Sequence, residues 1–204
     1  MRIKTTLFTI LLLTFSSIVF CQNYNKEIET QFLKYNDLIL KKEFNKSMDF
    51  VPEKFFEIIP REQMVLLMEK TFNNPEMEFE LKGPKNIVIA ESKKIEEKFY
   101  SMLTYSSLMN MKFNSSEKKE ETETEQKLRI NLIKLSLQNT FGPDNVKFIE
   151  STGFFEVNAQ KQAIAISNDG KTDWKFLVFE NKQKAILTKL LPKEFTEEIE
   201  KNNR

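Results

Sequence analysis

The sequence predicts an α+β domain, in which a curved antiparallel sheet packs against N-terminal helices and one mid-chain helix. Three observations predict this class. Apolar residues recur at helical spacing in the N-terminal third, they alternate with a period of two over much of the remainder, and a helical stretch ending at Gly142-Pro143 separates two groups of strands. Because regular crossover helices do not separate the strands, a doubly wound parallel sheet is not expected.

The N-terminal third contains three helical stretches. Residues Tyr24–Lys42 carry apolar side chains at steps of three and four, as an amphipathic helix does. A shorter helix is expected over Phe44–Phe50, where Pro52 ends it. Pro60 then suits the first turn of a third helix, which Asn73-Asn74-Pro75 closes.

Extended segments follow the third helix. Met77–Leu81 alternates apolar and charged residues, which predicts a half-buried strand. Ile87–Ala90 is apolar throughout and suits a central strand. A longer strand is expected over Lys98–Phe113, with a bend or bulge near Ser106-Ser107, where its apolar positions change phase.

A helix is expected over Gln126–Phe141. Leu128, Ile130 and Leu132 also alternate as in a strand, but the length and the Gly142-Pro143 terminator favour a helix. One side of this helix carries an apolar stripe with two flanking residues: Leu128, Leu132, Leu135 and Asn139, flanked by Ile133 and Leu137.

The C-terminal part predicts an antiparallel meander and a last short helix. Trp174–Phe179 is apolar on both faces, which predicts a position inside the sheet. Pro192 opens the last helix, with Phe195 and Ile199 facing inward. The expected strands are Val146–Glu150, Phe154–Asn158, Ala163–Ser167, Trp174–Phe179 and Lys184–Leu187.

The N-terminus has the pattern of a cleavable export signal. A basic start precedes an apolar run, Leu7–Phe20, that is too short to cross a bilayer comfortably. A cut after Cys21 gives a signal peptide over residues 1–21 and a single α+β domain over residues 22–204, in the periplasm or outside the cell. Two alternatives remain, an uncleaved anchor and a lipoprotein tethered through Cys21, although the bulky Phe20 argues against lipidation.

Composition excludes several classes of function. After removal of residues 1–21 the chain keeps 29 Lys and Arg against 30 Asp and Glu, a net charge near −1, so no electrostatic case exists for binding nucleic acid or an anionic membrane. The chain has no His, and Cys21 is its single Cys, which removes His-dependent nucleophile systems and ordinary zinc and copper sites. We therefore expect no cofactor and no transmembrane segment after signal cleavage. The composition does not exclude enzymes that use paired carboxylates, a Ser-Lys dyad, or Mg²⁺ or Ca²⁺ bound by oxygen ligands.

Two kinds of candidate site stand out, each with a structural alternative. Trp174, Tyr100, Tyr105, Met102 and Met109 are candidates to line an apolar ligand pocket, or they fill the core. Two acidic groups suit Ca²⁺ only weakly, because both lack the spacing of a dedicated calcium loop, and charge runs are usually solvated. They are Glu76, Glu78 and Glu80, and then Glu120, Glu121, Glu123 and Glu125.

The order of elements resembles a known group. A helix pair built as Phe32–Tyr35–Leu38 and Phe44–Met48–Phe50 with Pro52, followed by a meander ending in Trp174-Lys175-Phe176, resembles the nuclear-transport-factor-2-like, or cystatin-like cone, group. The chain is also similar to small exported proteins of unknown function from Gram-negative bacteria. Enzymes of that group often use a His/Asp or Asp/Tyr pair, and this chain lacks His. An alternative is a duplicated half-domain, since Ile58–Glu62 and Leu190–Glu194 both have two apolar residues followed by Pro, a basic residue and Glu.

These observations predict an exported non-enzymatic domain that binds a small apolar molecule or a partner protein in the concavity of its sheet. One alternative is a structural or assembly protein of the bacterial cell envelope, which includes a homodimer. Another is a carboxylate-based hydrolase or isomerase, which requires at least two buried Asp or Glu side chains in one cleft.

Overall fold

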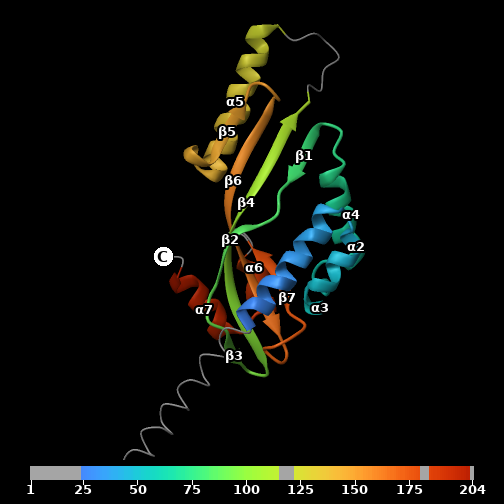
Figure 1. Cartoon of the computed structure of the whole chain (residues 1–204), viewed down its shortest axis with the longest axis vertical. Coiled ribbons are helices and arrows are strands. Elements are labelled where there is room, and N and C mark those ends of the chain that lie inside the picture. Colours follow the sequence, from blue (N-terminus) through green and yellow to red (C-terminus); the bar gives the residue numbers. More distant parts are fainter. Residues whose placement is uncertain (1–23, 115–121, 180–183, 203–204) are drawn as a thin grey trace, which may run out of the picture.

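Two long antiparallel strands, β4 (Lys98–Phe113) and β6 (Phe154–Ser167), form the axis of the molecule (Figure 1). The computed structural model describes residues 24–114, 122–179 and 184–202, so the predicted export signal, Cys21 and residues 115–121 of the predicted acidic segment lie outside it. β4 and β6 pair without a break from Phe99 opposite Ser167 to Met111 opposite Phe155. The expected α+β class, with a curved antiparallel sheet packed against N-terminal helices and one mid-chain helix, is confirmed.

Five short strands share the outer edges of this long pair. β1, β2 and β3 pair in turn with β4, while β5 and β7 pair with β6, all of them antiparallel. Their bounds are β1 (Met77–Leu81), β2 (Lys85–Ile89), β3 (Lys93–Ile95), β5 (Val146–Ile149) and β7 (Lys175–Phe179). The sheet therefore has one half flanked by β1 and β5, and another flanked by β2, β3 and β7.

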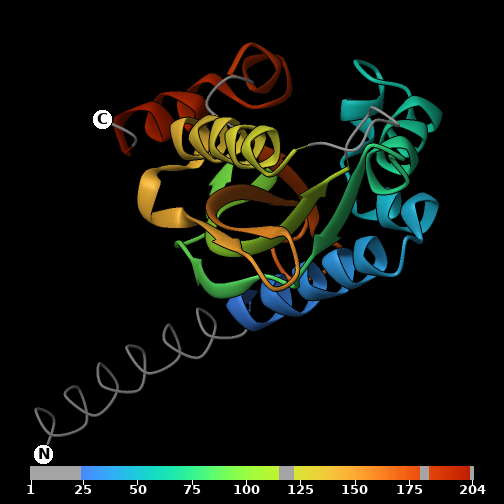
Figure 2. The same ribbon diagram turned by 90° about the horizontal axis from the view of Figure 1, so that it is seen from above.

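Two expectations about the positions of strands are wrong. The Ile87–Ala90 run lies mostly in β2, whose one partner strand in the described part of the chain is β4, and Val88 is exposed. β7, from the expected central strand Trp174–Phe179, pairs only with β6 among the described residues. Its two apolar faces have another cause, because helices cover both sides of the sheet in this half (Figure 2).

The expected irregularity lies in a different strand. β4 keeps its register with β6 through Ser106 and Ser107, so it carries no bulge against that partner. The register shift occurs in β2, between Lys85 and Val88, and Asn86 adopts a φ of 52° there. Asn86 donates a hydrogen bond from Nδ2 to Ser106 Oγ at 3.1 Å, which holds the irregular strand against β4.

The N-terminal helices form as expected, with one addition. Residues 24–40 form a helix, and the chain continues through α2 (Phe44–Ser47) and the short 3₁₀ helix η1 (Met48–Phe50). α4 (Arg61–Phe72) begins directly after Pro60. The additional element is α3 (Glu53–Phe56), a single turn after Pro52.

The mid-chain helix, α5, begins earlier than expected, at Glu123, and ends at Phe141. Thr122 and Glu125 form a capping box, in which Glu125 N–H donates to Thr122 Oγ1 at 3.3 Å and Thr122 N–H donates to Glu125 Oε2 at 2.8 Å. Gly142, with a φ of 93°, ends the helix, and its N–H donates to Gln138 O. The 3₁₀ helix η2 (Pro143–Asn145) leads into β5.

Two expectations about the C-terminal part are also corrected. Phe154–Asn158 and Ala163–Ser167 are one strand, β6, because the polar residues between them continue the pairing with β4. Lys184–Leu187 is not a strand but the start of α6 (Lys184–Leu190). Leu187 and Leu191 lie four residues apart, the spacing that puts both on one helix face, and both are buried. The last helix is α7 (Lys193–Asn202), where Phe195 and Ile199 are buried as expected.

The two halves of the sheet bury apolar residues differently. In the half flanked by β3 and β7, helix 24–40 lies on one face and α6 and α7 lie on the other (Figures 1 and 2). In the half flanked by β1 and β5, the apolar cluster packs against α5, while the opposite face carries polar pairs such as Lys112 with Glu78 at 3.1 Å. Among the described helices, none is both long and apolar enough to cross a membrane.

Candidate functional site

The five residues predicted to line a pocket lie in different parts of the core. Trp174 is fully buried, and its backbone N–H donates to Gln31 Oε1 at 2.8 Å. Tyr105 packs on the ring of Phe32, with centroids 4.9 Å apart. These two residues and Phe176 belong to the core under helix 24–40, which therefore fills this side of the sheet with side chains of the chain itself.

The other three pocket candidates lie elsewhere. Tyr100 packs against Phe195 of α7, with ring centroids 5.2 Å apart, and Met102 lies half-buried at the edge of the same cluster. Met109 belongs to the second cluster, under α5. The structure therefore does not bring the five together around one space, and their role in ligand binding stays a prediction.

The buried tyrosines are neutral phenols at physiological pH. Burial raises the pKa of Tyr35 to about 12. Burial and the neighbouring Tyr35 raise the pKa of Tyr105, and burial and Glu96 raise that of Tyr100. A tyrosine with a raised pKa is a poorer source of phenolate, so these groups suit packing and not proton abstraction.

The raised pKa of Tyr35 predicts a loss of stability at alkaline pH. The unfolded chain ionises tyrosine near pH 10, whereas the folded chain keeps Tyr35 protonated up to about pH 12. The contribution of Tyr35 is therefore complete below about pH 10 and is lost as the pH rises through 12. Urea unfolding at several alkaline pH values measures this decline, and Tyr35→Phe should make it shallower. An unchanged slope in that variant would contradict the assignment.

The carboxylates do not form the constellation that a carboxylate-based hydrolase needs. Among the residues with described side chains, no Asp or Glu is buried. No group of three or more Asp or Glu residues that is suited to a metal ion occurs in the described part of the chain either. Glu78 and Glu80 are engaged by Lys112 and Lys82, at 3.1 Å and 3.4 Å. The calcium hypothesis therefore gains no support from the described residues.

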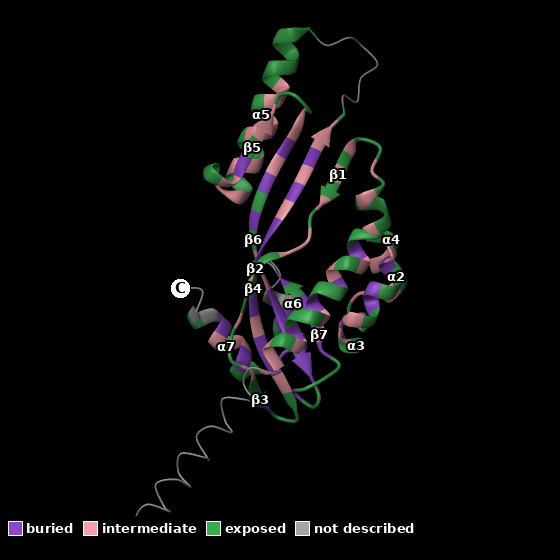
Figure 3. Ribbon diagram, in the orientation of Figure 1, coloured by how far each residue is buried: buried purple, intermediate pink, exposed green. Residues whose placement is uncertain are grey.

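The clearest unpartnered feature is the outer face of α5. The inner face of this helix packs on the sheet through Ile130, Ile133, Leu137 and Phe141. The opposite face carries Leu128, Leu132 and Leu135, which we call the leucine face, and these side chains are 60%, 59% and 56% exposed. α5 is therefore apolar on two sides, and the described part of the chain covers only one of them (Figure 3).

Polar groups border the leucine face asymmetrically. By helical position, Lys127 and Lys134 lie along one edge, and Glu125 lies near the N-terminal end of the other. Lys127 pairs with Glu123 at 2.5 Å, an exposed pair that contributes little to stability. Among the described residues, Lys134 has no ion-pair partner. Because Glu123 balances the charge of Lys127, this edge of the leucine face carries one unbalanced positive charge, that of Lys134.

The sequence shows the apolar stripe that forms the leucine face, but it does not show that this stripe points away from the sheet. Leu128, Leu132 and Leu135 are visible as a stripe with helical spacing, and Ile133 and Leu137 flank it. A helix with apolar residues on two sides leaves open which side meets the sheet. Comparison of this chain with protein-family models, curated proteins and solved structures finds no match in any of the three, so the resemblance to the nuclear-transport-factor-2-like group stays a prediction.

Proposed function

We propose that this chain is an exported, non-enzymatic domain that binds a partner protein on the leucine face of α5. The observation that carries the proposal is the exposure of three leucines, each more than half exposed, on the side of the helix opposite its packed face. An apolar face with a polar rim is typical of a surface that another protein covers. Export rests on the sequence of residues 1–21.

The shape of the surface favours a protein over a small apolar molecule. Side chains of helix 24–40, Phe32 among them, occupy the sheet face that a pocket in the concavity would need. The leucine face, in contrast, lies on the outside of a helix, with leucines at spacings of four and three residues. Such a row fits into the groove of a partner or against a second helix.

The charges at the rim indicate the chemistry of the partner. Lys134, whose charge no acidic group balances among the described residues, gives one edge of the leucine face a net positive charge. Antiparallel pairing of two copies would bring this edge against itself, with a cost from like charges. A different protein with acidic groups beside its own apolar row would meet the same edge favourably. The partner is therefore expected to be a protein other than a second copy. A role in assembling the cell envelope would use the same surface.

Replacing Leu132 by Glu is expected to abolish this association and to leave the fold intact. Leu132 is exposed, so the change in the free energy of unfolding should stay within about 0.5 kcal/mol. In the complex, the same carboxylate would be buried without a partner, which should weaken binding by more than about tenfold. Native mass spectrometry of the protein recovered from its own envelope fraction measures the association.

The expected spectra differ clearly between the two chains. The wild-type chain should appear with a second protein, and the Leu132→Glu chain should appear alone. Ile133→Ala is the matched control on the packed side, and it should cost about 1–3 kcal/mol of stability while the complex remains. A dimer of the wild-type chain, or equal complexes in both chains, would contradict the proposal.

A further inference from the structure

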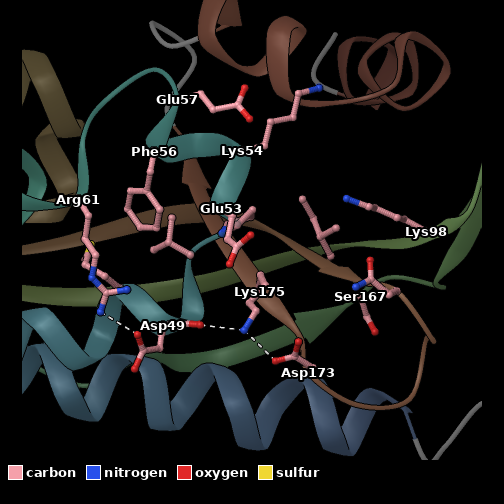
Figure 4. Close-up of a pocket in the computed structure, with 15 residues that line it drawn as sticks. Asp49, Glu53, Lys54, Phe56, Glu57, Arg61, Lys98, Ser167, Asp173 and Lys175 are labelled. Atoms are coloured by element: carbon pink, nitrogen blue, oxygen red, sulfur yellow. Dashed lines mark hydrogen bonds and ion pairs between the residues drawn. The ribbon is translucent and has the colours of Figure 1, made fainter.

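An open cleft lies between α3 and the ends of β4, β6 and β7 (Figure 4). In Figure 1 these elements lie far along the sheet from α5. The cleft measures about 770 Å³, within the range of sites that hold small molecules. One wall is the segment from η1 through α3, and the other is formed by the start of β4, the end of β6 and the start of β7. Met48, Val51, Phe56 and Ile166 supply apolar surface.

One charged side chain, Lys175, joins the two walls of the cleft, and Arg61 braces the helical wall. Lys175 Nζ donates to the backbone carbonyl of Asp49 at 2.9 Å and to Asp173 Oδ1 at 2.7 Å, so it links β7 to η1. Arg61 pairs with Asp49 Oδ1 at 2.7 Å and also donates to Asn45. Both side chains are therefore already engaged, and the Lys175 contacts fix the spacing between the walls.

The loop that follows β6 is also well ordered by its own hydrogen bonds. Asp169 Oδ1 accepts from the N–H groups of Lys171 and Thr172, both at 2.8 Å, and Thr172 Oγ1 donates to Asp169 Oδ2 at 2.6 Å. Ser167, which lines the cleft, donates to Thr172 O at 2.7 Å. This wall is therefore preorganised, which lowers the entropic cost of binding a ligand.

Four charged side chains that line the cleft make no ion pair or hydrogen bond with the described residues through their charged groups. Two are carboxylates, Glu53 and Glu57, and two are ammonium groups, Lys54 and Lys98. Figure 4 shows them around the same space, with Lys98 pointing into it from β4 and Lys54 extending from α3. The free groups are therefore of both signs and equal in number.

We propose that this cleft binds a small zwitterionic ligand, of the class of amino acids and short peptides. The ammonium groups of Lys54 and Lys98 receive its carboxylate, and the carboxylates of Glu53 and Glu57 receive its cationic group. A purely anionic ligand would meet the two glutamates and Asp173, and a purely cationic one would meet the two lysines. Like-charge contacts therefore select against both. This site is independent of the leucine face.

Titration of the ¹⁵N-labelled protein with the dipeptide glutamyl-lysine tests the proposal. The dipeptide should shift the backbone amide signals of Glu53, Lys54 and Lys98 in a saturable manner. Succinate and putrescine, which carry charges of one sign only, should bind at least about tenfold more weakly. Added salt should weaken the binding of the dipeptide, because the cleft is open to solvent.

Variants separate the site from nonspecific charge effects. Lys98→Gln and Glu53→Gln remove one unpaired charge of each sign, and each should weaken binding at least about fivefold. Lys70→Gln changes an exposed lysine outside the cleft and should leave binding unchanged. The proposal is overturned if the dipeptide causes no saturable shift, if succinate or putrescine binds equally well, or if the Lys70 variant weakens binding as much as the Lys98 variant.

Discussion

Replacing Phe32 by alanine should lower the free energy of unfolding by about 3–5 kcal/mol, the usual cost of removing a buried aromatic ring. Phe32 is fully buried, and its ring lies 4.9 Å from that of Tyr105 and 5.1 Å from that of Phe176. It therefore joins helix 24–40 to β4 and to β7 at once. The cavity left by alanine would separate all three elements, and the edge-to-face ring contacts would be lost as well.

Urea unfolding followed by circular dichroism measures this cost. The matched control is Leu33→Ala, on the neighbouring residue of the same helix, which is 42% exposed. It should cost less than about 1 kcal/mol, since it removes little buried surface. Equal losses in the two variants would mean that helix 24–40 does not pack on the sheet through Phe32.

Trp174→Ala should cost a similar amount, about 3–5 kcal/mol, whereas Trp174→Phe should cost clearly less. The indole is fully buried, so alanine leaves a large cavity. Its Nε1 is also buried without a hydrogen-bond partner among the described residues. An unpaired buried donor costs about 1–3 kcal/mol, and phenylalanine removes that cost while keeping most of the apolar volume.

The same unfolding experiment compares the two variants at Trp174. Circular dichroism is the suitable probe, because the chain has no other tryptophan to report by fluorescence. If phenylalanine is as damaging as alanine, the indole N–H has a partner. If Trp174→Ala lowers the free energy of unfolding by less than about 1 kcal/mol, Trp174 does not stabilise the core, and that result would favour its predicted role in a ligand pocket.

The sequence was informative where local patterns decide the structure. Period-two alternation located β1, helical spacing located helix 24–40, and Pro60 and Gly142 located the ends of two helices. The sequence was misleading where pairing between distant strands decides the structure. The two strands expected over Phe154–Asn158 and Ala163–Ser167 are one continuous strand, because β4 pairs with the residues between them as well. The sequence of that segment alone does not show that β4 lies beside it.

The two candidate surfaces differ in how far the sequence could predict them. The leucine face consists of residues close together in one helix, so its apolar stripe was visible, and only the packing of Ile133 and Leu137 on the sheet shows that it faces outward. The cleft joins residues such as Glu53, Lys98 and Lys175, which are far apart along the chain. Their types are common surface residues, so only the fold brings them together.

Site-specific photocrosslinking at position 132 is the most direct test of the central claim, that the leucine face of α5 binds a partner protein. A photoreactive phenylalanine replaces Leu132, and in a second chain it replaces Glu62, an exposed residue of α4. After irradiation of cells that make the protein, position 132 should yield one discrete adduct with a different protein, and position 62 should not. Loss of that adduct when Leu128 and Leu135 are both changed to Glu would tie it to the leucine face. If position 132 gives no adduct, or if both positions give the same one, the leucine face is not the binding surface.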